Sequence, residues 1–157
     1  MHPPALYHYW PSRTHLLREA SALGWERFRA GQSASVTGAD DPIVRLEQRG
    51  RAYLEFSLAE PALFRVLFLL PGSMDPSAAP AAEGQAMTEL TADVAAAMRA
   101  GVLLPQDPLT TALVLWSAVH GIASLWAATP GMPADLARSV AHASQRAVLT
   151  GLATPTE

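Results

Sequence analysis

Histidine is the side chain that can do acid–base or metal chemistry near neutral pH, and the 157-residue chain contains five of them. His120 is the most informative, because it lies in an apolar stretch, 109–128, that carries no formal charge. A histidine in such a place could orient the polar end of a ligand through a hydrogen bond. It could equally be a neutral core residue with its own hydrogen bonds inside the protein, and the sequence leaves both roles open.

The other sequence patterns that could support catalysis or metal binding are weak. His2, His8 and His15 could be read as metal ligands, but Pro11 interrupts the helical register between them, so no metal site and no cofactor are expected. The chain has no cysteine, which excludes disulfides, thiolate zinc sites and cysteine catalysis. It also lacks a glycine-rich phosphate loop, a nucleophile elbow and a His-Glu-x-x-His motif, so we expect no enzyme.

The composition is that of a well-buried helical protein. Half of the residues are hydrophobic and 16% are charged, and the length suits one domain with a real core. The net charge of −3 does not favour nucleic-acid binding by the whole chain, although residues 1–30 are mildly basic. No secretory signal pattern is seen at the start of the sequence, and a cytoplasmic location fits the lack of cysteine.

Capping signals and apolar spacing predict an all-α fold. A helix follows Ser12 and stops near Gly31, and a second follows Asp40 or Asp41, with Pro42 in its first turn. A short buried helix begins near Pro61. Longer helices are expected over 81–100, which Gly101 ends, and over 109–128 and 134–152.

The helix at 109–128 is apolar nearly all round, so one subunit alone cannot cover it. The last helix carries a stripe of small residues that would let another helix approach closely. We therefore expect a homodimer with a four-helix interface. The residues predicted to form it are Leu115, Ile122, Ala137, Ala141, Ser144 and Val148. Two alternatives remain: both helices pack only within one subunit, or the segment 109–128 is a membrane span.

Three stretches together resemble the TetR family of transcriptional repressors. "PPALYHYWPSRTHLLREA" resembles the third and fourth helices of its DNA-binding domain, where aromatic residues precede a short turn with a basic residue. "AYLEFSLAEPALFRVLF", 52–68, resembles a region where a helix ends and proline starts a short one. "LWSAVHGIASLW", 115–126, resembles a Trp-three-His-Gly segment in the eighth helix of one family branch.

The resemblance implies a partial helix-turn-helix and connecting helix at 1–31, and a ligand-binding and dimerisation domain at 32–157. It implies phosphate contacts by Tyr7 and Arg13, and groove contacts by His2, Pro3, Ala5 and His8. About forty residues of the family's plan would precede Met1, so we expect an N-terminally truncated chain whose own DNA binding is compromised. A misplaced gene start would explain this beginning.

The resemblance also implies a pocket for a small hydrophobic or aromatic effector, lined by apolar and aromatic side chains. The residues expected to line it are Tyr53, Phe56, Phe64, Phe68, Met87, Met98, Trp116 and His120. The leading hypothesis is a ligand-responsive regulator that binds operator DNA as a homodimer. The alternatives are a small-molecule-binding dimer without DNA binding and a membrane-associated helical protein.

Overall fold

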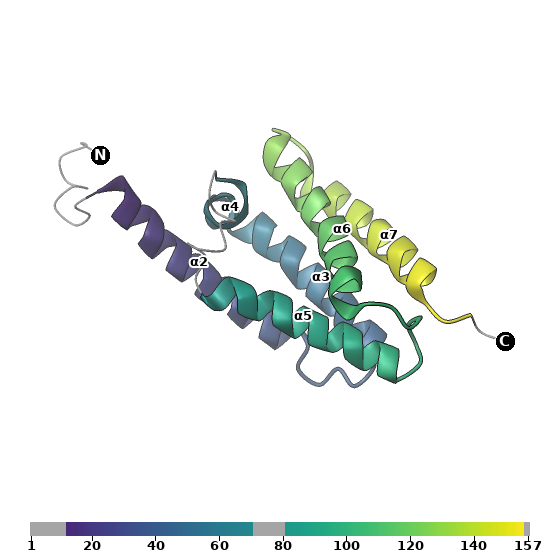
Figure 1. The fold of residues 1–157 in the computed structure, drawn as a ribbon. Coiled ribbons are helices and arrows are strands. Elements are labelled where there is room, and N and C mark those ends of the chain that lie inside the picture. Colours follow the sequence, from purple (N-terminus) through teal and green to yellow (C-terminus); the bar gives the residue numbers. More distant parts are fainter. Residues whose placement is uncertain (1–11, 71–80, 156–157) are drawn as a thin grey trace.

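The computed structural model describes residues 12–70 and 81–155, and every regular element in these ranges is a helix. The predicted all-α class is confirmed. Figure 1 shows α6 and α7 running side by side, with α3 behind them and α2 extending away toward the N-terminus. The elements in chain order are α2 (Arg13–Ser35), α3 (Pro42–Ala59), α4 (Pro61–Phe64), the π-helical η1 (Arg65–Leu69), α5 (Ala81–Arg99), α6 (Pro108–Ala128) and α7 (Ala134–Leu152).

Most helix boundaries follow the predicted local signals. The Ser12 hydroxyl accepts a hydrogen bond from the His15 N–H at 3.1 Å. Of the two candidate caps for α3, it is the Asp41 carboxylate that accepts from the N–H groups of Ile43 and Val44. Gly101 has φ of +74°, the left-handed conformation expected just after a helix, and α5 ends at Arg99.

The predicted stop at Gly31 is wrong, because α2 continues to Ser35. Its last turns are held by a tertiary contact: the buried Gln32 side chain donates to the Arg49 carbonyl oxygen on α3 at 3.2 Å. A stabilising contact of this kind outweighs the small helix penalty of one glycine. The domain boundary expected between residues 31 and 32 therefore falls inside a continuous helix.

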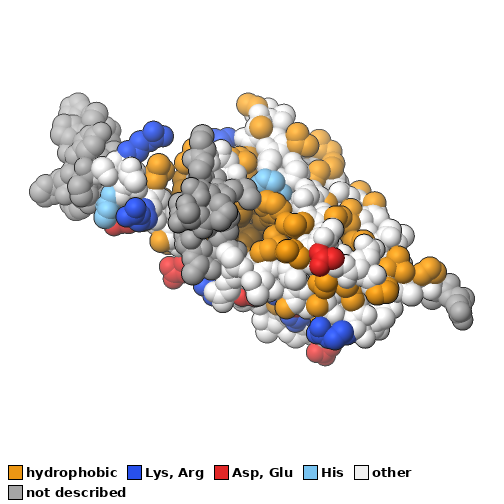
Figure 2. All heavy atoms as spheres, viewed as in Figure 1, with side chains coloured by type: hydrophobic (Ala, Val, Ile, Leu, Met, Phe, Trp, Pro, Cys, Tyr) orange, Lys and Arg blue, Asp and Glu red, His pale blue; other side chains and the backbone are white. Residues whose placement is uncertain are grey.

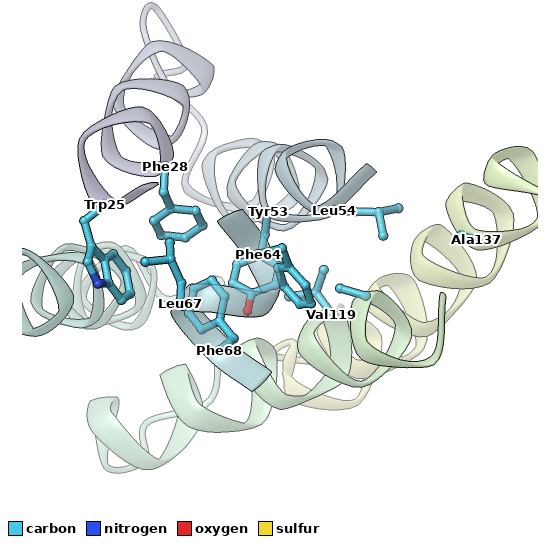
Figure 3. Close-up of a cluster of buried hydrophobic side chains, with 10 residues drawn as sticks. Trp25, Phe28, Tyr53, Leu54, Phe64, Leu67, Phe68, Val119 and Ala137 are labelled. Atoms are coloured by element: carbon cyan, nitrogen blue, oxygen red, sulfur yellow. The ribbon is translucent and has the colours of Figure 1, made fainter. Parts of the chain in front are cut away.

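The core consists of two clusters stacked along α6. The first gathers aromatic rings from α2, α3, α4 and η1 against Val119 and Ala123 of α6 (Figure 3). The second is aliphatic and lies between α3, α5, α6 and α7; its buried members are Leu46, Val94, Ala97, Leu103, Ala112, Leu115 and Leu149. Rings of the aromatic cluster lie around His120, so the packing of this cluster positions the candidate site.

Candidate functional site

A short chain of polar groups crosses the aromatic cluster. The Tyr53 hydroxyl of α3 lies 2.7 Å from Nδ1 of His120 on α6. The other ring nitrogen, Nε2, lies 3.3 Å from the Ser124 hydroxyl, one helical turn further along α6. Tyr53 is 3% exposed, whereas His120 and Ser124 are partly exposed, so the chain runs from the core toward the surface.

Aromatic rings enclose this polar chain. Trp116 stacks on the His120 ring with centroids 4.7 Å apart and an interplanar angle of 26°. Phe64 and Phe68 place their ring centroids 6.1 Å and 5.8 Å from the His120 ring. Figure 3 shows Tyr53, Phe64 and Phe68 converging from α3, α4 and η1. The histidine is therefore a polar group in an apolar wall, the arrangement that fixes ligand orientation in many binding sites.

Burial sets the protonation states of His120 and Tyr53. It lowers the pKa of the His120 imidazole below its ordinary value of 6.5, because a charged ring is poorly solvated among apolar neighbours. Burial also raises the pKa of the Tyr53 phenol well above its ordinary value. Near neutral pH both groups are therefore uncharged, and the phenol keeps its proton as a hydrogen-bond donor.

Six of the eight residues predicted to line a pocket are brought together, in or against the aromatic cluster: Tyr53, Phe56, Phe64, Phe68, Trp116 and His120. Met87 and Met98 are not among them. Both pack against the aliphatic cluster instead, since they lie on the same face of α5 as the buried Val94.

Sequence reasoning missed three residues of this region. Ser124 is four positions after His120, the spacing that brings two side chains together on one helix face, and that spacing was a usable signal. Trp25 and Phe28 of α2 make edge-to-face contacts with Phe68, at centroid distances of 5.3 and 5.7 Å. No local pattern in α2 indicates this long-range contact.

The residues predicted to touch DNA lie mostly outside the described part of the chain. His2, Pro3, Ala5, Tyr7 and His8 belong to residues 1–11. Arg13 is described: it is the first residue of α2, and its side chain is exposed.

The six residues predicted at a dimer interface face the interior of the chain. Leu115 and Ala137 are buried, and Ile122, Ala141 and Val148 pack against the two clusters. Ser144, also on this side of α7, is partly buried. The small-residue stripe of α7 lies on the side of the helix that packs closely on α6 within one subunit.

Other faces of α6 and α7 expose apolar side chains. On α6, Leu109 and Leu113 lie along one edge of the solvent-facing side, and Val114 and Leu125 lie along the other edge, with Leu125 57% exposed. On α7, exposed Leu136, Val140, Ala143 and Ala147 recur at helical spacing and form one stripe. Figure 2 shows hydrophobic side chains gathered along α6 on the face in view. By length and composition α6 could cross a membrane. It packs on α3, α5 and α7, although only 22% of its most apolar stretch is buried within the chain.

Comparison with known proteins gives a family and a fold. A family model described as tetracyclin repressor-like, C-terminal domain, matches residues 46–147. A solved structure of a protein of unknown function from Rhodococcus sp. RHA1 is 27% identical, with a TM-score of 0.74 over 91% of this chain and 74% of that one. A TetR-family transcriptional regulator from Pectobacterium atrosepticum is 23% identical, with a TM-score of 0.67 over 100% of this chain and 80% of that one. No curated protein matches.

Proposed function

The chain belongs to the tetracyclin repressor-like (TetR) family through its C-terminal domain, and on this premise we propose that it is a ligand-responsive transcriptional regulator. The observation that carries the ligand part is the Tyr53–His120–Ser124 hydrogen-bond chain inside a ring-lined wall. The proposed effector is a small hydrophobic or aromatic molecule that contacts Trp116 and His120, in a protein that works in the cytoplasm.

The proposed regulator acts as a homodimer through the outer faces of α6 and α7. What supports this is the exposed apolar set described above, defined here as the outer face: Leu109, Leu113, Val114, Leu125, Leu136, Val140, Ala143 and Ala147. The leucines of the outer face are 42–57% exposed to solvent, and a two-fold partner that presents the same surface would cover them.

Operator binding is proposed from the resemblance of residues 1–18 to the family's recognition helix and the turn that follows it. Tyr7 and Arg13 are assigned to phosphates, and His2, Pro3, Ala5 and His8 to base edges. Specific binding also requires the two helices that brace a recognition helix in a helix-turn-helix. The action on transcription is proposed to be repression.

A second function, a ligand-binding dimer without DNA binding, is favoured by one observation. The family match concerns the C-terminal domain and begins at residue 46, so it supports ligand binding and association independently of any DNA contact. Measuring DNA binding by the chain alongside ligand binding separates the two functions.

A thermal-shift screen with small hydrophobic and aromatic compounds tests the ligand part. A ligand at one hundred times its dissociation constant stabilises the fold by about 2.7 kcal/mol. Compounds that raise the melting temperature of the parent should lose most of that shift in His120→Ala. They should keep it in His142→Ala, a matched control on the exposed side of α7. If no compound shifts the parent, or if hits shift all three proteins equally, the ligand site is not at His120.

A further inference from the structure

We propose that the site beside His120 selects a neutral, largely apolar molecule that carries a carbonyl-type acceptor, such as a ketone, aldehyde, ester or amide. The inference rests on the proposed function, because it names the ligand chemistry of the same site. It excludes carboxylates and amines as preferred ligands, and it makes Nε2 of His120 the group that recognises the carbonyl oxygen.

The direction of the inner hydrogen bond carries the argument. The Tyr53 hydroxyl is buried, and a buried hydroxyl that gives its proton to no acceptor is costly. The acceptor that the described structure provides is Nδ1 of His120, 2.7 Å away. A neutral imidazole has one donor and one acceptor nitrogen, so once Nδ1 accepts, the ring proton must be on Nε2. Tyr53 thereby makes the outer edge of His120 a donor.

A ligand can replace the hydrogen bond between Nε2 of His120 and the Ser124 hydroxyl. Nε2 lies 3.3 Å from the Ser124 oxygen, longer than the usual range for an N–H···O bond. His120 and Ser124 are both partly exposed, and the Ser124 hydroxyl can rotate to water when it loses this contact. A ligand oxygen placed at a normal distance from Nε2 therefore gains a better hydrogen bond than the one it displaces.

Charge decides which polar groups of a ligand can bind favourably at Nε2 of His120. Among the described residues, the recorded partners of the His120 side chain are Tyr53, Ser124, Phe64, Phe68 and Trp116, none of which carries a charge. A carboxylate would lose its hydration there without gaining a countercharge. An amine would bring its N–H groups against the N–H of Nε2. A neutral carbonyl meets neither penalty, and its apolar body can lie against Trp116 and the phenylalanine rings.

A set of probes with one apolar body tests the proposal: ethylbenzene, acetophenone, benzoate and benzylamine, each titrated at millimolar concentrations and followed by His120 ring resonances. Acetophenone should bind about three- to tenfold more tightly than ethylbenzene, the gain that one net hydrogen bond gives. Benzoate and benzylamine should bind more weakly than acetophenone. Equal or tighter binding of benzoate at His120 would overturn the carbonyl assignment.

Two variants, compared with the parent by thermal shift, separate recognition from packing. His120→Phe keeps a ring against Trp116 but has no N–H, so acetophenone should lose its advantage over ethylbenzene. Ser124→Ala removes the competing acceptor, so acetophenone should bind up to about threefold more tightly while ethylbenzene is unchanged. A purely structural role for Ser124 predicts no such selective gain, and an unchanged ratio in both variants contradicts the proposal.

The tautomer can be read in the unaltered protein, which keeps the test independent of how well the variants fold. The ¹⁵N shifts of His120 should show Nε2 protonated and Nδ1 unprotonated; the opposite tautomer overturns the inference. If none of the four probes perturbs His120, the proposed ligand site itself fails. If ethylbenzene or benzoate perturbs His120 while acetophenone gains nothing, the carbonyl assignment alone fails.

Discussion

His120 gains its role from the side chains around it. On the sequence it is one histidine in an uncharged helix, and its two open roles were ligand orientation and neutral core residue. In the structure it has hydrogen-bond partners on both nitrogens and a stacked indole, which meets the needs of a neutral histidine, yet it is only half-buried. The two roles are therefore compatible: Nδ1 holds the ring through its hydrogen bond with Tyr53, and Nε2 remains able to bind a ligand.

The lowered pKa of His120 predicts a pH dependence of stability. The unfolded chain takes up a proton at His120 near pH 6.5, whereas the folded chain resists protonation until a lower pH. Between the two values the unfolded state binds more protons, so the free energy of unfolding falls as the pH drops below about 6.5. The melting temperature measured from pH 7.5 to pH 5.5 should therefore fall more in the parent than in His120→Gln. Parallel curves would contradict this account.

The inner hydrogen bond should also be measurable as stability. Tyr53→Phe keeps the ring and its edge-to-face contact with Phe28, and removes the donor to Nδ1. We expect a loss of about 1 kcal/mol in the free energy of unfolding by urea, the usual net value of one hydrogen bond. The same substitution in the background of His120→Phe should cost less, because the partner is already gone. An equal cost in both backgrounds would show that the two side chains are not coupled.

At the scale of elements, α3 and α5 are joined by a network of charged side chains. Arg45 and Arg49 of α3 both contact the Asp93 carboxylate of α5, with Arg45 Nη2 at 2.9 Å, and Arg49 also reaches Glu89. Arg49 and Asp93 have side chains only 9% and 12% exposed. Breaking such a buried pair leaves a charge without a partner, so this contact fixes how the two helices sit against each other.

Removing the shared carboxylate tests that view. Asp93→Ala should lower the free energy of unfolding by about 3 kcal/mol, because it leaves Arg45 without a carboxylate partner and the buried Arg49 with only Glu89. The control is Asp135→Ala, which removes a 95% exposed carboxylate 3.0 Å from Arg138 on α7 and should cost at most about 0.5 kcal/mol. Urea unfolding of both variants gives the comparison. Similar costs for the two would mean that the α3–α5 network contributes no more than a surface pair.

Element boundaries were predictable where a local side chain sets them, and not elsewhere. Ser12 and Asp41 hydrogen-bond to N–H groups two or three residues away, so sequence alone reveals them. The end of α2 depends on Gln32 meeting Arg49, which is 17 residues distant in the chain. The aromatic site follows the same rule: its residue types were visible, but the packing of Phe64 in the aromatic cluster and of Met98 against the aliphatic one depends on how α4 and α5 pack.

At the scale of the whole molecule, the sequence pattern of α7 does not determine which of its faces packs within the chain. Two stripes of apolar side chains on this helix could pack against another helix, one through Ala137 and Ala141 and one through Val140 and Ala143. The sequence predicts only the first of these as a contact, and a helical pattern does not say which element covers it. The structure gives the first stripe to α6 of the same chain and leaves the second exposed. The site of association proposed here follows from that exposure.

Val140→Glu tests the proposed dimer. A carboxylate in the middle of the outer face should shift the protein from dimer to monomer in light scattering at micromolar concentration, because the charge would be buried without a partner. His142→Glu is the matched control, since the exposed His142 lies on the side of α7 away from Val140, and it should remain a dimer. Ala141→Arg packs a charge against the aromatic cluster and should unfold the chain rather than simply dissociate it. A parent that is monomeric contradicts the proposal.

The ligand site at His120 is the central claim, and a titration of the unaltered protein with isotope-labelled histidines tests it most directly. A compound from the thermal-shift screen is added while the ring resonances of His120, His15 and His142 are followed together. The account predicts that His120 shifts and saturates at the concentration that saturates the thermal shift, while exposed His15 and His142 stay in place. A stabilising compound that leaves His120 unmoved would contradict it.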